Sequence, residues 1–410
     1  MRFVTRRAVV STIAAGMLAT GAWPTVATAQ ESRPIRIGVP TAIQLQVGRD
    51  TQTAVQMAID EINAQGGLLG RKLEMVVADE TENPEQGIAA IKKLTADEKA
   101  DVLVGGYTSG VTLAQLPHIT RAKTIYIGVG AASPAITAQV RRNYDANKYI
   151  FRAFPINAAH QARGLVDFIS GKLKGEMGLK KIAIVGENAK WVQDLVPILK
   201  KGATDAGTDV VLAEFFDTST SDFSPLLSKV KDAGAEYLVI ILSHASSDIF
   251  VKQWYDSQAP FPIGGIDVKG QDQDFFNRVS GKALTETAAN FAVRAEITPK
   301  TIPFWDEFVK RAGSAPVYTG VGAYDAVHIY ADAVRRANST DPEKVIPELE
   351  KTSYIGVAGK IEFDENHDVK AGPGFINILF AQWRDGGERV IVWPKALATG
   401  EMIPPPWLKK

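Results

Sequence analysis

Two neighbouring hydroxyl groups, those of Thr108 and Ser109, stand where a sequence could bind an anion. They follow a short apolar segment that ends in Gly105 and Gly106, and they precede a segment with helical periodicity. The first N–H groups of a helix have no partner inside the helix, and the helix dipole favours negative charge there. Tyr107, Thr108 and Ser109 could therefore hold a carboxylate without a full countercharge. A hydroxyl at this place can also cap the helix, so both roles remain open.

Other patterns in the chain do not combine into catalytic machinery. Residues 128–133, Gly-Val-Gly-Ala-Ala-Ser, lack the third glycine of a dinucleotide-binding loop. No Gly-x-Ser-x-Gly motif is present, and the chain has no cysteine nucleophile. The five histidines have no metal-ligand spacing; they occupy positions 118, 160, 244, 328 and 367. We therefore expect no enzyme activity, no cofactor and no metal, and an exported α/β enzyme is the weaker alternative.

Composition limits the class of protein and of partner. The 410 residues are too many for one small core and favour two domains. The 46 basic and 46 acidic residues cancel, so no excess charge is available to hold nucleic acid. No apolar run reaches the roughly 18 residues that a membrane span needs.

The first thirty residues are typical of an export signal. Arg2, Arg6 and Arg7 precede an uncharged stretch, 8–22, which is followed by the small-x-small pattern Ala27-Thr28-Ala29. We expect residues 1–29 to be a cleaved signal peptide, and the paired arginines leave a twin-arginine route open. Without cysteine, the mature protein can carry neither a disulfide nor a lipid anchor on a Cys, so we expect a soluble periplasmic protein.

The elements that must position these residues alternate between short apolar runs and longer amphipathic stretches. This rhythm predicts parallel strands joined by crossover helices. In the first series we expect strands at 35–39, 73–78, 101–104 and 124–128 and helices at 51–64, 85–97 and 111–121. In the second series we expect helices at 160–173 and 191–206 and strands at 181–185 and 210–216.

The C-terminal third mixes both kinds of element. A short strand at 288–292 leads into a helical block at 303–338, and strands follow at 360–363, 375–381 and 389–393. The segment 99–104 is similar to 234–239, which suggests that the two halves are related units. The pattern predicts an α/β fold of two Rossmann-like lobes with mainly parallel sheets and a ligand cleft at the carboxyl ends of their strands.

The segment 62–94 carries a more specific pattern. Its order of residues resembles the first-lobe signature of periplasmic solute-binding proteins of the branched-chain amino-acid (leucine/isoleucine/valine-binding) type, which serve ABC importers. The matching residues are Asn63, Gly66, Gly67, Gly70, Arg71, Asp79, Asn83 and Pro84, and the resemblance continues at 104–109 and 131–134.

This resemblance implies a type I periplasmic-binding-protein fold, a bilobal (Venus-flytrap) architecture with three crossings between lobes. We expect lobe I to comprise 30–154 and 288–355, and lobe II to comprise 155–287 and 356–410. The implied partners are a small-molecule ligand and an ABC transporter permease in the inner membrane, and the implied protein is a monomer without catalysis.

The resemblance also suggests residues of the first lobe that contact the ligand. Ser109 stands where the family places its carboxylate-binding serine. The loop that contains Gly130, Ala131, Ala132 and Ser133 aligns with the family's other carboxylate and ammonium loop. Ala132 replaces the threonine that grips the amino-acid head group. An alanine side chain cannot accept a hydrogen bond from an ammonium, so this replacement weakens the prediction of an α-amino acid ligand.

Four further candidates lie outside those loops. Trp191 is the aromatic that would close over the ligand or, alternatively, a core residue. His244 follows the strand 237–242, and Asp267 is the implied ammonium-binding acid or else a helix cap. Gln46 belongs to the loop 41–46, where exposure to solvent is the simpler explanation.

These observations predict capture of a small carboxylate-bearing solute by hinge closure. A branched-chain or other apolar amino acid is the ligand that the resemblance implies. An aromatic acid or an amide is the alternative, as is a role as a ligand-sensing subunit.

Overall fold

The computed structural model describes residues 1–3, 33–291 and 293–408. Apart from its first three residues, the predicted signal peptide lies outside the described residues. The chain divides into two units, Met1–Arg33 and Pro34–Lys410, and the second unit contains the whole fold described below.

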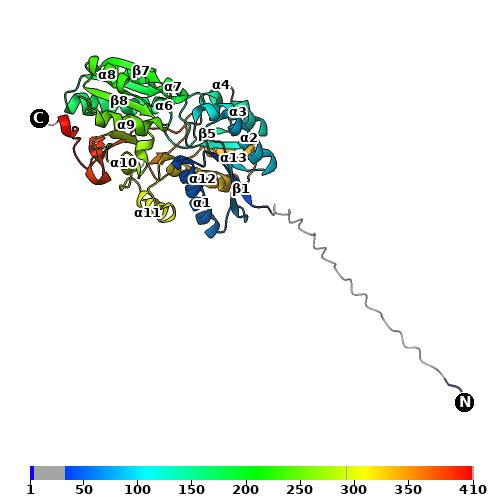
Figure 1. Cartoon of the computed structure of the whole chain (residues 1–410). Coiled ribbons are helices and arrows are strands. Elements are labelled where there is room, and N and C mark those ends of the chain that lie inside the picture. The colour runs from blue at the N-terminus through cyan, green and yellow to red at the C-terminus, as the bar shows by residue number, and fades with distance from the viewer. Residues whose placement is uncertain (4–32, 292, 409–410) are drawn as a thin grey trace. The chain divides into compact units, whose positions relative to one another are not determined.

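The first sheet has five parallel strands in the order β2-β1-β3-β4-β5. Figure 1 labels two of them, β1 and β5. Its strands are β1 (Ile35–Thr41), β2 (Leu73–Asp79), β3 (Val102–Gly105), β4 (Ile125–Gly128) and β5 (Ile150–Arg152). The helices between them are α1 (Gln46–Ala64), α2 (Pro84–Lys92), α3 (Ser109–Ala122), α4 (Ala138–Arg142) and α5 (Tyr144–Asn147), and α2 continues into a π-helical turn, Lys93–Asp97. Parallel strands that are buried on both faces need such crossover helices.

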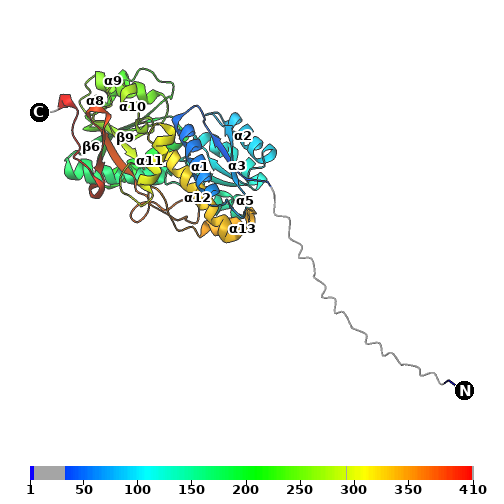
Figure 2. The same cartoon turned by 90° about the horizontal axis from the view of Figure 1, so that it is seen from below.

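Three later helices return to this first lobe. They are α11 (Thr301–Ala312), α12 (Tyr318–Ala337) and α13 (Pro342–Glu350). Helix α1 packs on α11 and α12, and α12 packs on α13 and β3, as Figure 2 shows for α1, α11 and α12. The five-stranded sheet is therefore covered by segments from both halves of the chain.

The second sheet has seven strands in the order β14-β13-β10-β9-β8-β6-β7. Its strands are β6 (Lys181–Glu187), β7 (Asp209–Phe216), β8 (Tyr237–Leu242), β9 (Ile263–Asp267), β10 (Thr287–Asn290), β13 (Leu379–Trp383) and β14 (Arg389–Trp393). Strand β13 pairs antiparallel with both β10 and β14, and the other pairs are parallel. The helices are α6 (Ala158–Asp167) with a π-helical continuation (Phe168–Glu176), α7 (Lys190–Asp205), α8 (Ser224–Asp232), α9 (Ser246–Asp256) and α10 (Phe275–Arg278). A short hairpin, β11 (Tyr354–Ile355) and β12 (Lys360–Ile361), precedes the last two strands.

The two sheets repeat one strand order. The run β7-β6-β8-β9-β10 corresponds to β2-β1-β3-β4-β5, with β13 and β14 added at one edge. The similar segments 99–104 and 234–239 lead into β3 and β8, which occupy the same place in the two sheets. The predicted α/β fold of two Rossmann-like lobes is confirmed.

The residues of the sequence signature have structural roles in these elements. Asn63 near the end of α1 binds the backbone of Leu73 in β2 through both atoms of its amide, at 2.9 and 2.8 Å. Gly67 ends the helix with a left-handed φ of 81°, and a Cβ there would lie 2.0 Å from the carbonyl oxygen of Arg71. Asn83 caps α2 by accepting from two backbone N–H groups, and Pro84 takes the first helical position.

The predicted helix 51–64 begins five residues earlier than expected. Gly48 in its first turn lies so close to Ala42 that a Cβ would be 2.0 Å from the Ala42 carbonyl oxygen. The buried carboxylate of Asp50 accepts from the N–H of Val317 at 2.8 Å. These contacts with tertiary neighbours stabilise the first turn of α1, which the local sequence pattern did not predict.

The lobe boundaries stay a prediction, and strand pairing bears on one of them. β10 pairs with β9 and β13 in the seven-stranded sheet, whereas the expected boundary placed residues from 288 onward in lobe I. We propose that this crossing follows Asn290.

Candidate ligand-binding site

A cavity of about 580 Å³, its mouth included, lies where loops after strands of both sheets meet. Four aromatic side chains form much of its wall: Tyr107, Trp191, Phe291 and Tyr318. The aliphatic lining is Ala132, Ile156, Ile266, Val268 and Ala289, and the remaining residues are Thr108, Ser109, Gly130, Gln161, Ser243, His244 and Gln271. The lining combines apolar walls with a few polar groups, as small-molecule sites do.

The structure brings most of the predicted site residues together around this cavity. Those that line it are Tyr107, Thr108, Ser109, Gly130, Ala132, Trp191 and His244. Gln46, Ala131, Ser133 and Asp267 are not among the lining residues. Gln46 starts α1 and bonds to Asp50 and Arg49, so it does not belong to the predicted loop.

The start of α3 presents unused hydrogen-bonding groups to the cavity. Thr108 is the N-cap residue, yet its side chain makes no capping bond, and its buried Oγ1 has no partner. Ser109 Oγ accepts from the backbone N–H groups of Ala132 and Ser133, both at 3.0 Å. Because these bonds occupy both lone pairs, the Ser109 hydroxyl can act toward a ligand only as a donor.

The loop after β4 packs closely against the loop after β3. A Cβ on Gly130 would lie 2.1 Å from the carbonyl oxygen of Gly106, so this approach requires glycine. Tyr318, at the start of α12, donates its hydroxyl to the Gly130 carbonyl at 3.1 Å. The returning helices thus help to hold the loop that carries Ala132.

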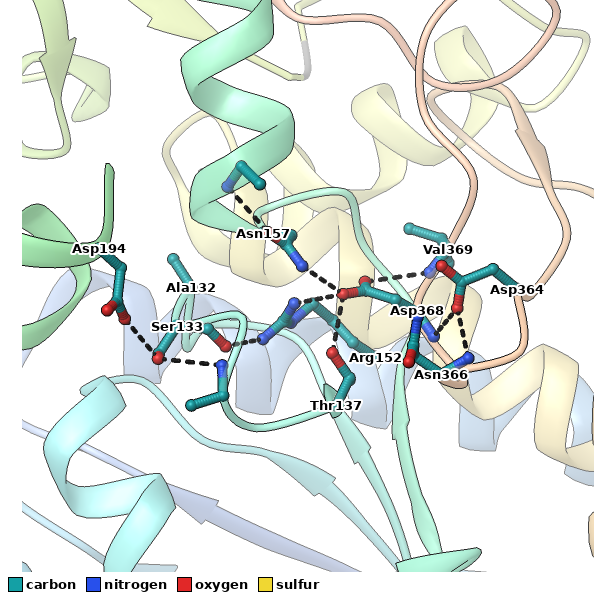
Figure 3. Close-up of polar contacts among 12 residues, drawn as sticks. Ala132, Ser133, Thr137, Arg152, Asn157, Asp194, Asp364, Asn366, Asp368 and Val369 are labelled. Atoms are coloured by element: carbon teal, nitrogen blue, oxygen red, sulfur yellow. Dashed lines mark hydrogen bonds and ion pairs between the residues drawn. The ribbon is translucent and has the colours of Figure 1, made fainter. Parts of the chain in front are cut away.

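Ser133 is not among the lining residues and links this loop to Arg152 and Asp194, as Figure 3 shows. Its carbonyl accepts from Arg152 Nη2 at 2.6 Å, and its hydroxyl donates to Asp194 Oδ2 at 2.6 Å. Arg152, at the end of β5, forms a 2.6 Å ion pair with Asp368, and both side chains are almost fully buried. Asp368 also accepts from Thr137 Oγ1 and Asn157 Nδ2, at 2.9 and 2.6 Å.

On the second lobe, a buried carboxylate orients His244. Glu187 ends β6, and its Oε2 lies 2.7 Å from His244 Nδ1 and accepts from Ser243 Oγ at 2.9 Å. Burial raises the pKa of Glu187, but the hydrogen bonds and charge of His244 outweigh burial and hold the pKa below its ordinary value. Burial lowers the pKa of His244, but Glu187 and Glu82 together raise it above its ordinary value. The pair therefore favours an imidazolium facing the cavity.

Asp267 is a buried partner of other protein groups. It accepts from Ser247 Oγ at 2.6 Å and from the N–H of Lys269 at 2.9 Å, and it has no exposed surface. Burial raises the pKa of Asp267 and also that of the neighbouring Glu286. These bonds engage Asp267 inside the protein, and its contact with a ligand ammonium stays a prediction.

The two lobes touch across the cavity. Tyr107 Oη donates to the carbonyl of Ser243 at 3.2 Å, and His244 Nε2 lies 3.6 Å from Glu82 Oε1. With the bond from Ser133 to Asp194, these contacts make the arrangement a closed one.

Sequence reasoning missed the lining residues that come from remote segments. Gln161 lies in the first turn of α6, Tyr318 at the start of α12, and Phe291 just after β10. Glu187 carried a usable signal, because it is a polar residue at the end of a buried strand, but the expected strand stopped at 185.

Within 33–291 and 293–408, no helix is both long and apolar enough to cross a membrane. Over the same residues, no three His, Cys, Asp or Glu side chains gather in a way that could hold a metal ion.

The family comparison agrees with this geometry. A model of the periplasmic binding protein family matches residues 34–388. The chain belongs to the periplasmic binding protein family. The resemblance seen at 62–94 is thereby confirmed over most of the chain.

Known relatives and structures extend this result. The Leu/Ile/Val-binding protein homolog 1 of Brucella melitensis is 28% identical, over 86% of this chain and 91% of the relative. A putative branched-chain amino acid ABC transporter structure from Silicibacter pomeroyi has a TM-score of 0.79 at 22% identity, covering 91% of this chain and 100% of that one. An ABC-transporter solute binding protein from Rhodopseudomonas palustris BisB5, in complex with 3,4-dihydroxy benzoic acid, has a TM-score of 0.74 at 21% identity and covers 87% and 95%. As a periplasmic binding protein, the chain has the fold of these structures.

Proposed function

We propose that this periplasmic binding protein is the substrate-binding component of an ABC importer and captures a small carboxylate-bearing solute between its lobes. The observation that carries the proposal is the start of α3, where a donor-only Ser109 hydroxyl and the unpartnered Thr108 hydroxyl meet inside an apolar cavity. A helix start with free donors favours an anion, and apolar walls favour an organic one.

Capture would occur by closure of the two lobes. The bonds from Tyr107 to Ser243 and from Ser133 to Asp194 join the lobes on either side of the cavity. A ligand that contacts both lobes binds the closed form better than an open one, so it shifts the population toward closure. The closed form would then dock on a permease in the inner membrane, with the protein acting as a periplasmic monomer.

The names of the relatives support two classes of ligand. One relative is named for leucine, isoleucine and valine, and one structural neighbour holds a dihydroxybenzoic acid. Both ligand classes carry a carboxylate, which is the part that the start of α3 would bind.

A thermal-shift screen of the mature chain, starting at Gln30, tests the function. The panel comprises amino acids and aromatic acids, which carry a carboxylate, and the corresponding amides, in which the carboxylate is replaced. A ligand at 100 times its Kd adds about 2.7 kcal/mol of stability, so a true ligand raises the melting temperature clearly. Carboxylates should give the largest shifts. The absence of a shift with every carboxylate, or chemical turnover of a bound compound, would contradict the proposal.

A further inference from the structure

The cavity wall has no negative charge with which to meet an ammonium group. Among the described residues that line it, none is an aspartate or a glutamate, and Nδ1 of the lining His244 lies 2.7 Å from Glu187 Oε2 behind it. An α-amino acid would therefore bring its ammonium group against a wall that offers it no carboxylate. Burying a charge without a counterion is costly.

Glu187 and Asp267, two acids near the cavity, are already engaged by other protein groups. Glu187 accepts from His244 Nδ1, from Ser243 Oγ and from the N–H of His244. Asp267 accepts from Ser247 and Lys269 and is fully buried. Neither residue belongs to the cavity lining.

The neutral groups favour an anion for the same reason. Ser109 can only donate, because both lone pairs of its oxygen are used, and Ala132 offers no side-chain acceptor. None of the polar side chains in the lining carries a negative charge; they are Thr108, Ser109, Gln161, Ser243, His244 and Gln271.

The aromatic side chains present ring surface to the ligand and not polar atoms. Tyr107 Oη is bonded to the Ser243 carbonyl, Tyr318 Oη to the Gly130 carbonyl at 3.1 Å, and Trp191 Nε1 to Ser243 Oγ at 3.3 Å. With Phe291 they enclose the cavity in rings whose polar ends are satisfied inside the protein. Such walls suit a flat aromatic body, which gains from offset-stacked and edge-to-face contacts.

Gln161 supplies a further polar requirement. Its side chain is 6% exposed and lines the cavity, and the buried Oε1 has no partner. A buried amide oxygen without a donor is unfavourable, so the ligand should complete it. A hydroxyl group both donates and accepts, so it serves either orientation of the amide.

From these contacts we propose that the ligand is an aromatic carboxylate that has no ammonium group and carries a hydroxyl on its ring. The inference rests on the proposed function and specifies the substrate class of the same site. The start of α3 binds the carboxylate, the four aromatic residues enclose the ring, and Gln161 meets the hydroxyl.

Isothermal titration of the mature chain with four compounds separates the two features. The compounds are 3-phenylpropanoate, 3-(4-hydroxyphenyl)propanoate, L-phenylalanine and L-tyrosine, which differ only in the ammonium and the hydroxyl. Benzoate and 4-hydroxybenzoate extend the series to shorter ligands, and L-leucine with 4-methylpentanoate extends it to aliphatic ones. We expect each acid to bind at least tenfold more tightly than its amino acid, and each hydroxylated acid more tightly than its parent.

A variant pair assigns the hydroxyl contact. Gln161→Leu should abolish the preference for the hydroxylated acids and leave binding of the unsubstituted acids within about threefold. Gln193→Leu, an exposed glutamine of α7 in the same lobe, should leave every affinity unchanged. A hydroxyl preference that persists in Gln161→Leu would overturn the assignment of Gln161.

The outcomes distinguish this inference from the proposed function. Equal or tighter binding of the amino acids in the wild-type series would overturn the ligand class while leaving the carboxylate capture intact. Tighter binding of 4-methylpentanoate than of every aromatic acid would overturn the aromatic part. If no compound of the series binds, both the inference and the proposed carboxylate capture fail. The wild-type comparison decides these points even if Gln161→Leu does not fold.

Discussion

Ser133 donates its hydroxyl to the Asp194 carboxylate at 2.6 Å, and this bond joins the loop after β4 to helix α7 of the other lobe. The N–H of the same serine binds Ser109 at 3.0 Å. One residue therefore contacts both Ser109, which we propose binds the carboxylate, and the opposite lobe, so the geometry of this loop is coupled to the contact between the lobes.

Asp194→Asn should weaken ligand binding although Asp194 does not line the cavity. The hydrogen bond to a charged acceptor stabilises the closed form, and its loss should lower affinity by roughly 1 kcal/mol, mainly through faster dissociation. Stopped-flow release of the ligand measures this. Asp205→Asn on the same helix, where the carboxylate pairs with Lys201, is the control and should leave the release rate unchanged. A normal release rate in Asp194→Asn would remove the bond from the closing mechanism.

Ser109→Ala should reduce the affinity for carboxylates by about 1 to 3 kcal/mol. The change removes the donor to the ligand and also the acceptor for the N–H groups of Ala132 and Ser133. Titration calorimetry measures the loss. Ser224→Ala, at the start of the exposed helix α8, is the matched control. Unchanged affinity in Ser109→Ala would exclude Ser109 from the site.

Trp191→Ala should cost more for an aromatic or bulky apolar ligand than for a small one. Trp191 is 8% exposed and lines the cavity, so its ring should supply a large contact, worth on the order of 2 kcal/mol or more for a ring-bearing ligand. Affinities of a large and a small carboxylate, measured on the same variant, test this. Equal losses for both would show that Trp191 acts only as a core residue.

The His244 and Glu187 pair should stabilise the protein over a defined pH range. The pKa of His244 is raised, so its contribution is complete below its ordinary value of 6.5 and is lost as pH rises through the higher folded pKa. The pKa of Glu187 is lowered, so its contribution is complete above its ordinary value of 4.5 and is lost as pH falls through the lower folded pKa. Both contributions are present between those two values.

Urea unfolding of His244→Gln tests this pH dependence. The difference in unfolding free energy from the wild type should be largest near pH 5.5 and should shrink above pH 6.5. His118→Gln is the control, because burial lowers the pKa of His118 and the sign of its contribution is opposite. A difference for His244→Gln that does not vary with pH would contradict a charged His244.

Asp368→Asn should destabilise the fold strongly. Arg152 would lose its carboxylate partner while both side chains are 3% exposed or less, and breaking a buried pair costs roughly 3 to 5 kcal/mol. Denaturant unfolding measures the change. Glu365→Gln removes the exposed partner of Arg141 and should change stability by less than about 1 kcal/mol. Equal effects of the two variants would contradict a structural role for the buried pair.

Local patterns were sufficient for the elements and for part of the site. The glycines after α1, the Asn83 and Pro84 start of α2, and the apolar runs of β6 and β8 act through neighbours in the sequence, so they could be predicted. The loop after β3 was found in the same way, because a hydroxyl between a strand end and a helix start is a local signal.

The partners of those residues could not be predicted in this way. Ser133 and Asp267 were expected at the ligand, but Asp194, Arg152 and Ser247 bind them instead. Gln161 and Tyr318 gave no local signal, since their place at the cavity depends on helices that return from distant parts of the chain.

The sequence by itself determined the alternation of strands and helices, the two related lobes, and the helix start that offers donors to an anion. Only the tertiary structure decided which polar groups remain unsatisfied at the cavity. The physical reason is that a side chain's hydrogen bonds and charge are compensated by whatever the fold brings beside it. That neighbourhood left Thr108 and Gln161 unpartnered and engaged the carboxylates of Glu187 and Asp267.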